Sequence, residues 1–231
     1  MMSKTIRSRL LLAGAAAFVA PALAQAAPIG NAISVTPAAQ TEGSRGTLVL
    51  ARGGDLEAYD RVRTNTGGAA KLRFLDASTL DVGPGALVTL DRFVYNPDRS
   101  AAQASLTMAK GAFRWVSGRS AKEAYDLKTP HASIGIRGTD IRVFAEPEVT
   151  TVRLQSGAIR ACSRISGQCA EATRPGQGVR LWQDGRVETF GPGSQQQSPP
   201  VGRAALTPGP PDGGGGYPPT GVRPPQGGYP P

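Results

Sequence analysis

The stretch LRFLDASTLDVGPGA at residues 72–86 contains the pattern on which the fold prediction rests. Apolar and polar residues alternate in 71–74 and again in 79–82, which is typical of half-buried β-strands. Asp76-Ala77-Ser78-Thr79 lies between these runs, and its carboxylate and hydroxyls can bond local backbone amides in an Asx or ST turn. The stretch therefore predicts a strand, a turn and a second strand that ends at Gly83-Pro84-Gly85.

The same alternation recurs along the rest of the chain. Further short runs lie at 88–90, 106–108, 125–127, 141–143, 152–154 and 179–181. They are separated by turn signals such as Asn96-Pro97, Gly111, Gly118, Thr129-Pro130, Gly157, Pro175-Gly176 and Asp184-Gly185. No amphipathic helix is evident between the runs, so the sequence predicts an all-β domain. The alternation is compatible with a sandwich and with a solenoid-like roll of short strands.

The first 24 residues have the three parts of a secretory signal peptide. A basic start with Lys4, Arg7 and Arg9 precedes the apolar run 10–20, and Ala22-Leu23-Ala24 provides a small-residue cleavage site. The apolar run is shorter than the roughly 20 residues that a membrane span needs. We therefore expect cleavage and a periplasmic or secreted protein, whose formal charge would fall from +9 to +6.

The mature chain is expected to have three parts. Residues 25–40 show little pattern and should form a loose leader, and residues 41–190 should form the β domain. From 191 to 231 the chain is dominated by proline and glycine, and Gly-Gly-Tyr-Pro-Pro occurs at both 215–219 and 227–231. Such a segment buries too little apolar surface to offset the entropy of ordering, so we expect a disordered tail.

Two cysteines, Cys162 and Cys169, lie in the mature chain. Exported proteins meet an oxidising compartment, so a disulfide is the expected state. The turn signal Ser166-Gly167 between them predicts a hairpin that the disulfide links near its tip. Because the closed loop is short, the disulfide should contribute only a few kcal/mol at most.

Two further segments complete a recognisable set: LTMAKGAFRWVSG at 106–118 and KTPHASIGIRGTDI at 128–141. With 72–86, and with VRLQSG at 152–157, they resemble in order and spacing the FecR-like periplasmic domain, whose pattern reads DGSTL, KGxxRW/FxxG and TPxAxxGVRGT. The resemblance covers about 65–182. The family-motif residues are Asp76, Ser78, Thr79, Gly111, Trp115, Gly118, Thr129, Pro130, Gly135, Arg137, Gly138 and Thr139.

These motif residues are expected to be mainly structural. Ala77 stands where the family usually has glycine, so another residue should take any positive φ in the turn. Arg137 lies between Gly135 and Gly138, which suggest a bulge or close backbone approach. It could reach Asp76 or Asp140 and hold the strands in register, or alternatively bind an anion. Phe113 and Trp115 should face the core, and stacking on a ligand is the alternative.

The sequence predicts no catalytic, metal-binding or cofactor-binding residues. None of the nucleophile-elbow, P-loop, HExxH or dinucleotide motifs occurs in a suitable context. His131 is the only histidine and should be exposed or satisfied locally. Asp55, Glu57 and Asp60 look like scattered loop acids. We therefore expect a protein that is not an enzyme.

The resemblance implies a function in envelope signalling. FecR-like regulators of sigma factors carry a cytoplasmic segment, a membrane span and often a further domain, which we do not find in this sequence. We therefore expect a periplasmic binding or signalling-accessory module that docks a periplasmic or outer-membrane protein, or a cell-wall polymer, and no nucleic acid. The alternatives are a structural envelope protein tethered by its tail and a membrane-anchored regulator of iron-uptake or sigma-factor signalling.

Overall fold

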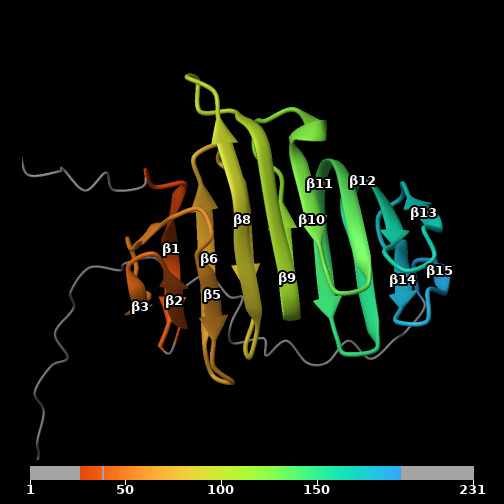
Figure 1. The fold of residues 1–231 in the computed structure, drawn as a ribbon. Coiled ribbons are helices and arrows are strands. Elements are labelled where there is room, and N and C mark those ends of the chain that lie inside the picture. The colour runs from red at the N-terminus through yellow and green to blue at the C-terminus, as the bar shows by residue number, and fades with distance from the viewer. Residues whose placement is uncertain (1–26, 38, 194–231) are drawn as a thin grey trace, which may run out of the picture.

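The computed structural model describes residues 27–37 and 39–193, which fold into fifteen strands and one short 3-10 helix (Figure 1). The predicted signal peptide at 1–24 and the tail from 194 onward lie outside the described residues. The strands are β1 (Gly30–Thr36), β2 (Ala39–Gly43), β3 (Gly46–Val49), β4 (Asp55–Leu56), β5 (Arg61–Thr64), β6 (Ala69–Phe74), β7 (Thr79–Val82), β8 (Leu87–Tyr95), β9 (Ala101–Val116), β10 (Tyr125–Lys128), β11 (Ala132–Ala145), β12 (Val149–Ser163), β13 (Cys169–Ala172), β14 (Gly178–Trp182) and β15 (Val187–Phe190), and the 3-10 helix is η1 (Lys122–Ala124).

The all-β prediction is confirmed, and every alternating run quoted above falls inside a strand. Three strands are nevertheless much longer than the short runs suggested: β9, β11 and β12 have 16, 14 and 15 residues. Gly111 and Gly157, expected in turns, instead lie inside β9 and β12 with φ of 109° and 87°. At both positions the strand bends or bulges and continues, because a neighbouring strand still pairs with it.

The long strands divide one continuous sheet into two layers. The first part of β9 pairs with β8 and with the parallel β10, whereas residues 111–116 pair with β7 and β11. β11 and β12 change partners in the same way. Layer 1 has the order β3-β2-β5-β8-β9-β10-β11-β12-β13, and layer 2 has the order β4-β1-β6-β7-β9-β11-β12-β14-β15.

The core lies between the two layers. Leu72, Leu80 and Trp115 of layer 2 belong to the same buried cluster as Val88 and Leu106 of layer 1. Rings from the two layers also stack, since the centroids of Phe74 (β6) and Phe93 (β8) are 4.8 Å apart. The packing is therefore sandwich-like, but it is made by one sheet that folds over on itself.

The expected loose leader at 25–40 is wrong for most of its length. β1 pairs with β6 along almost its whole length and also with β4, and β2 pairs with β5. Ile29 and Ala32 are buried by these contacts. The small residues of this stretch give a weak alternation, and it is the distant partner strand that orders them. Among the described residues, no helix is long and apolar enough to cross a membrane.

Candidate functional site

The turn between β6 and β7 is built around the buried carboxylate of Asp76. Its Oδ1 accepts hydrogen bonds from the backbone N of Ser78 at 3.0 Å and from the Ser78 hydroxyl at 2.6 Å. The first of these is the Asx-type bond that the sequence predicted. Its Oδ2 accepts bonds from the hydroxyls of Ser120 at 2.8 Å and Tyr125 at 2.5 Å. Asp76 is 1 % exposed, and its bonds satisfy both carboxylate oxygens without a cation.

Ala77 itself takes the positive φ of this turn, with φ of 68°. The expectation that another residue would do so is wrong. The reason is that Asp76 and Ser78 are held by side-chain and backbone bonds on either side, and the N of Ala77 bonds the carbonyl of Phe74 at 3.0 Å. An L-residue in this region is strained, and the neighbouring bonds maintain it.

The end of β9 closes over the same turn. The backbone N of Gly118 donates to the Tyr125 hydroxyl at 3.1 Å, and the N of Arg119 donates to the carbonyl of Asp76 at 3.0 Å. A side chain at Gly118 would collide with the backbone of Asp76 and Ser78. The glycine of this motif therefore permits a close backbone approach between two motif segments.

Tyr125 was missed by sequence reasoning, yet it joins three parts of this cluster. Its hydroxyl lies between Asp76 and Gly118, and its ring packs edge-on against Trp115 with centroids 5.4 Å apart. Burial, followed by the hydrogen bond to the Asp76 carboxylate, raises the pKa of Tyr125 to about 12. The sequence signal was only its position at the start of an alternating run.

Arg114, and not Arg137, makes the inter-strand ion pair. Its Nε and Nη2 donate to the two oxygens of Asp140 at 3.0 and 2.7 Å, and this bond raises the pKa of Arg114. Arg137 is exposed and makes no ion pair among the described residues. The predicted reach of Arg137 to Asp76 or Asp140 is therefore wrong: Asp140 is bonded by Arg114, and Asp76 is bonded by neighbouring hydroxyl groups.

The predicted bulge lies at Gly138 and Thr139. Two residues of β11 there stand opposite Gly157 of β12, and Gly138 has φ of 60°. The backbone N of Thr139 donates a hydrogen bond of 3.1 Å to the hydroxyl of Ser117, which directly follows β9. A Cβ at Gly135 would make only an ordinary van der Waals contact, 3.8 Å from the carbonyl oxygen of Arg160, and the close approach is instead between Gly157 and Gly138.

The segment Thr129-Pro130-His131 turns the chain from β10 into β11. The Thr129 hydroxyl accepts a bond from the N of Ala132 at 2.9 Å and lies 2.9 Å from the hydroxyl of Thr150. His131 is 8 % exposed, and its Nε2 donates to the carbonyl of Pro147 at 3.0 Å. The expectation that His131 would be exposed or satisfied by its sequence neighbours is therefore wrong. The β11–β12 turn brings the carbonyl of Pro147 to the buried ring.

Phe113 and Trp115 point into the core as predicted, with 3 % and 0 % exposure. Trp115 also lies beside Phe74, with ring centroids 5.7 Å apart. Neither ring lies on an accessible surface. Among the described motif residues, the aromatic pair therefore has a packing role.

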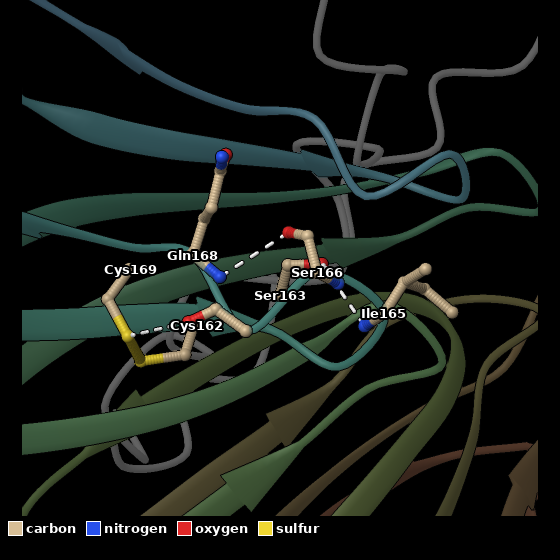
Figure 2. The surroundings of a disulfide bond; sticks show 7 residues. Cys162, Ser163, Ile165, Ser166, Gln168 and Cys169 are labelled. Carbon is tan, nitrogen blue, oxygen red and sulfur yellow. Dashed lines mark hydrogen bonds between the residues drawn. A yellow bond between two sulfur atoms is a disulfide. The ribbon is translucent and has the colours of Figure 1, made fainter.

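The disulfide is the predicted one. Cys162 on β12 and Cys169 on β13 stand directly opposite each other and are bonded (Figure 2). In the turn, the Ser163 hydroxyl accepts bonds from the N of Ile165 and Ser166, both at 3.2 Å. The predicted hairpin with a linked tip is confirmed.

The acids near position 57 form a cluster that the sequence did not reveal. Arg45 Nε lies 3.1 Å from Glu57 Oε1, and Arg45 Nη2 lies 3.8 Å from Asp60 Oδ2. The Ser44 hydroxyl also donates to Glu57 at 2.8 Å. Burial raises the pKa of Asp60. Their description as scattered loop acids is wrong for Glu57 and Asp60, and the cluster fixes the β2–β3 hairpin against the β4–β5 loop.

That hairpin presents an open edge. Among the described strands β3 pairs only with β2, and all four of its residues are exposed. Leu48 is 42 % and Val49 is 78 % exposed. Within residues 27–37 and 39–193, no group of three or more histidine, cysteine, aspartate or glutamate residues is placed to hold a metal ion. The described surface thus offers an apolar strand edge as its candidate site.

The described residues thus form an all-β domain whose motif turns are held by hydroxyl and backbone hydrogen bonds. Residues 60–160 match the family described as FecR protein. The match bears out the resemblance to the FecR family that the motifs predicted. FecR proteins are associated with the cell envelope and act in the regulation of signalling.

Two solved structures resemble this fold. Both are crystal structures, at 1.65 and 2.50 Å resolution, of a protein from Parabacteroides distasonis ATCC 8503 described as a putative anti-sigma factor. Each has 14 % identity and a TM-score of 0.46, and the match covers 57 % of this chain and 59 % of that chain. The chain thus matches less than two thirds of that protein's length. Comparison with curated proteins gives no match.

Proposed function

We propose that this protein is a non-enzymatic binding module of envelope signalling, which docks a partner protein by pairing β3 with an extended segment of that partner. The observation that carries the proposal is the open, uncharged edge of β3. Its sequence, Gly46-Thr47-Leu48-Val49, contains no charged residue and no proline. Natural proteins usually protect sheet edges with such residues.

The other edge strands of the two layers, β4, β13 and β15, differ from β3. β15 carries Glu188 and β13 carries Glu171, and β4 has only two residues. Strand addition takes its affinity from main-chain hydrogen bonds and its specificity from alternate side chains. On β3 these side chains include Leu48 and Val49, which are apolar and accessible.

The compartment that we propose is the periplasm. The basic, apolar and small-residue parts of 1–24 support a cleaved signal peptide. The Cys162–Cys169 disulfide supports an oxidising compartment. The FecR domain supports an envelope role, and the partner class that fits is a periplasmic or outer-membrane protein.

Site-specific photo-crosslinking tests the docking edge. A photo-reactive residue at Val49 should give one adduct of defined mass with an envelope protein in the producing cell. Leu48→Lys should abolish that adduct, because a lysine on the edge opposes strand addition. The matched controls are a photo-reactive residue at Ile165, which is 65 % exposed on the far hairpin, and Ile165→Lys, which should leave the Val49 adduct intact.

Three results would overturn the proposal. An equal adduct from Ile165 would show non-specific contact. An adduct with twice the mass of the chain would identify a homodimer edge. Crosslinking to cell-wall material alone would favour the structural envelope protein, with the proline-rich tail as its tether.

A further inference from the structure

We propose that Tyr59 is a second contact for the partner protein that docks on β3, and that its ring enters an apolar pocket of that partner, an inference that rests on the docking proposed above. Tyr59 lies in the loop of residues 57–60 between β4 and β5, and its side chain is 69 % exposed. Within the part of the chain that the structure describes, its hydroxyl makes no hydrogen bond and its ring stacks on no other aromatic ring. The fold thus makes little use of this side chain.

The backbone at Tyr59 is strained. Its φ is 70°, in the left-handed region that favours glycine. A bulky L-residue rarely takes this conformation, because its Cβ crowds the following carbonyl oxygen. Since the ring is exposed, burial of apolar surface does not offset the cost. Glycine would suit the fold better at this position, and strain that persists without a structural benefit points to a binding role.

Hydrogen bonds on both sides of Tyr59 maintain this conformation. The N of Tyr59 donates to the carbonyl of Leu90 at 2.6 Å, and the N of Leu90 donates to the carbonyl of Asp60 at 2.9 Å. The carboxylate of Asp60 accepts a bond of 2.9 Å from the N of Glu57. The backbone that carries the ring is therefore fixed before a partner arrives, which lowers the entropy cost of binding.

The same loop is fastened to the hairpin that carries β3. Arg45, in the β2–β3 turn, donates to the carbonyl of Asp55 at 3.1 Å, and its Nε lies 3.1 Å from Glu57 Oε1. Gly43, the last residue of β2, lies so close to the Asp60 carboxylate that a side chain there would collide with it. The loop and the β2–β3 hairpin therefore form one rigid unit.

Tyr59 and the edge of β3 are close enough to contact one partner. Gly43 stands opposite Gly46, the first residue of β3, and lies beside Asp60. In Figure 1, β3, β2 and β5 lie side by side. Because neighbouring strands are about 4.8 Å apart, the loop lies roughly 10 Å from the start of β3. Three of the five large, exposed apolar side chains of the described residues belong to this unit: Leu48, Val49 and Tyr59.

β3 alone is too short for a specific complex. It has four residues, and in an antiparallel pair only alternate residues exchange main-chain hydrogen bonds with an added strand. Specific interfaces bury roughly 800 Å² on each partner and depend on a few anchors, among which tyrosine is enriched. A tyrosine ring can fill an apolar pocket while its hydroxyl stays at the wet rim. Tyr59 supplies the anchor that the edge lacks.

The charged groups of the loop are paired within it and with the hairpin. Arg45 lies 3.1 Å from Glu57 and 3.8 Å from Asp60, and the Ser44 hydroxyl donates to Glu57 at 2.8 Å. Contact at Tyr59 therefore depends on its ring and hydroxyl, which suit an apolar pocket and not a charged ligand. Since the main-chain groups of β3 pair with another polypeptide strand, the partner that meets both features is a protein.

Photo-crosslinking from position 59 tests the shared contact. A photo-reactive phenylalanine analogue in place of Tyr59 keeps an aromatic ring, and it should give an adduct with the same envelope protein as the photo-reactive residue at Val49. With the probe at Val49, Tyr59→Gly should lower the adduct yield about tenfold, the loss expected when an interface anchor is truncated. Tyr59→Phe should keep the adduct, because the ring is retained.

Thermal unfolding separates recognition from a structural role. Tyr59→Gly should raise the melting temperature by roughly 1–4 °C, because glycine relieves the strain. The matched control is Arg99→Gly, since Arg99 is exposed in the β8–β9 hairpin and has φ of 64°. It should raise the melting temperature similarly and leave the Val49 adduct unchanged. A variant that is more stable yet docks less cannot owe that loss to unfolding.

The outcomes distinguish this inference from the docking of β3. A full yield of the Val49 adduct in Tyr59→Gly, or adducts with different proteins from positions 49 and 59, would overturn the role of Tyr59 and leave the docking edge standing. A lower melting temperature in Tyr59→Gly would attribute the lost adduct to the fold instead. Adducts of position 59 with cell-wall material alone would assign the ring to a sugar polymer. Absence of any adduct from Val49 would overturn the docking of β3 and this inference with it.

Discussion

The hydroxyl of Tyr125 donates a 2.5 Å hydrogen bond to the carboxylate of Asp76, 49 positions earlier in the chain. This bond joins the β6–β7 turn to the start of β10. It also brings Gly118 to the turn, because the same hydroxyl accepts the N–H of Gly118. The motif segments of the FecR domain thus meet at one buried carboxylate.

The burial of the Tyr125 hydroxyl, together with its bond to Asp76, predicts a loss of stability at alkaline pH. The pKa of Tyr125 is raised to about 12, against an ordinary value near 10 in the unfolded chain. As pH rises from 10 towards 12, the unfolded state loses this proton first, so the free energy of unfolding falls. Tyr125→Phe should reduce the slope of the free energy of unfolding against pH between 10 and 12, measured by urea unfolding at successive pH values.

The matched control is Tyr59→Phe, whose side chain is 69 % exposed. It should keep the slope of the parent protein. An unchanged slope in Tyr125→Phe would contradict the assignment of the alkaline transition to Tyr125.

Ala77→Gly should stabilise the protein. Ala77 has φ of 68°, where an L-residue costs roughly 1–2 kcal/mol and glycine does not. The greater freedom of glycine in the unfolded chain offsets part of this gain, so we expect about 0.5–1 kcal/mol in urea unfolding. Ala170→Gly in β13 is the control and should destabilise, since that strand position has no positive φ. A loss of stability in Ala77→Gly would count against strain at this turn.

Gly118→Ala should destabilise by more than about 2 kcal/mol, since a methyl group there would collide with the backbone of Asp76 and Ser78 and push residue 118 away from the turn. Thermal or urea unfolding measures the loss. Gly67→Ala, where a Cβ would have open space, should stay within about 0.5 kcal/mol of the parent. Equal effects of the two substitutions would show that the close approach at Gly118 is unimportant.

The disulfide should contribute modestly and locally. Closing a loop as short as Cys162–Cys169 removes unfolded-state entropy worth about 2 kcal/mol. A Cys162→Ser, Cys169→Ser double variant should therefore lose about that much, with faster hydrogen exchange in the β12–β13 hairpin than in β6 or β7. Mass spectrometry of the non-reduced parent should show the two cysteines linked, and two free thiols would refute the bond.

Several features could be predicted because their signals are local. The alternating runs of β6, β7 and β14, the Asx-type bond at Asp76 and the inward Trp115 all follow from patterns within a few residues. The Cys162–Cys169 hairpin does too, because its partners are close in sequence. The motif order was sufficient to indicate the FecR domain.

Other features could not be predicted because their partners are distant. β1 is ordered by β6, and Arg45 meets Glu57 and Asp60 only when the hairpin folds back. Arg137 was the reasonable candidate for Asp140, but the register of β9 against β11 places Arg114 there instead.

The sequence by itself determined that the described chain is built of strands, which turns separate them and which two cysteines join. These properties depend on period-two alternation and on turn chemistry, which act over a few residues. Only the tertiary structure decided that β9, β11 and β12 bend between two layers, that Asp76 meets Tyr125, and that Arg114, Arg142 and Arg153 stand in line. Those relations depend on strand register, which is set by pairing between segments far apart in the chain.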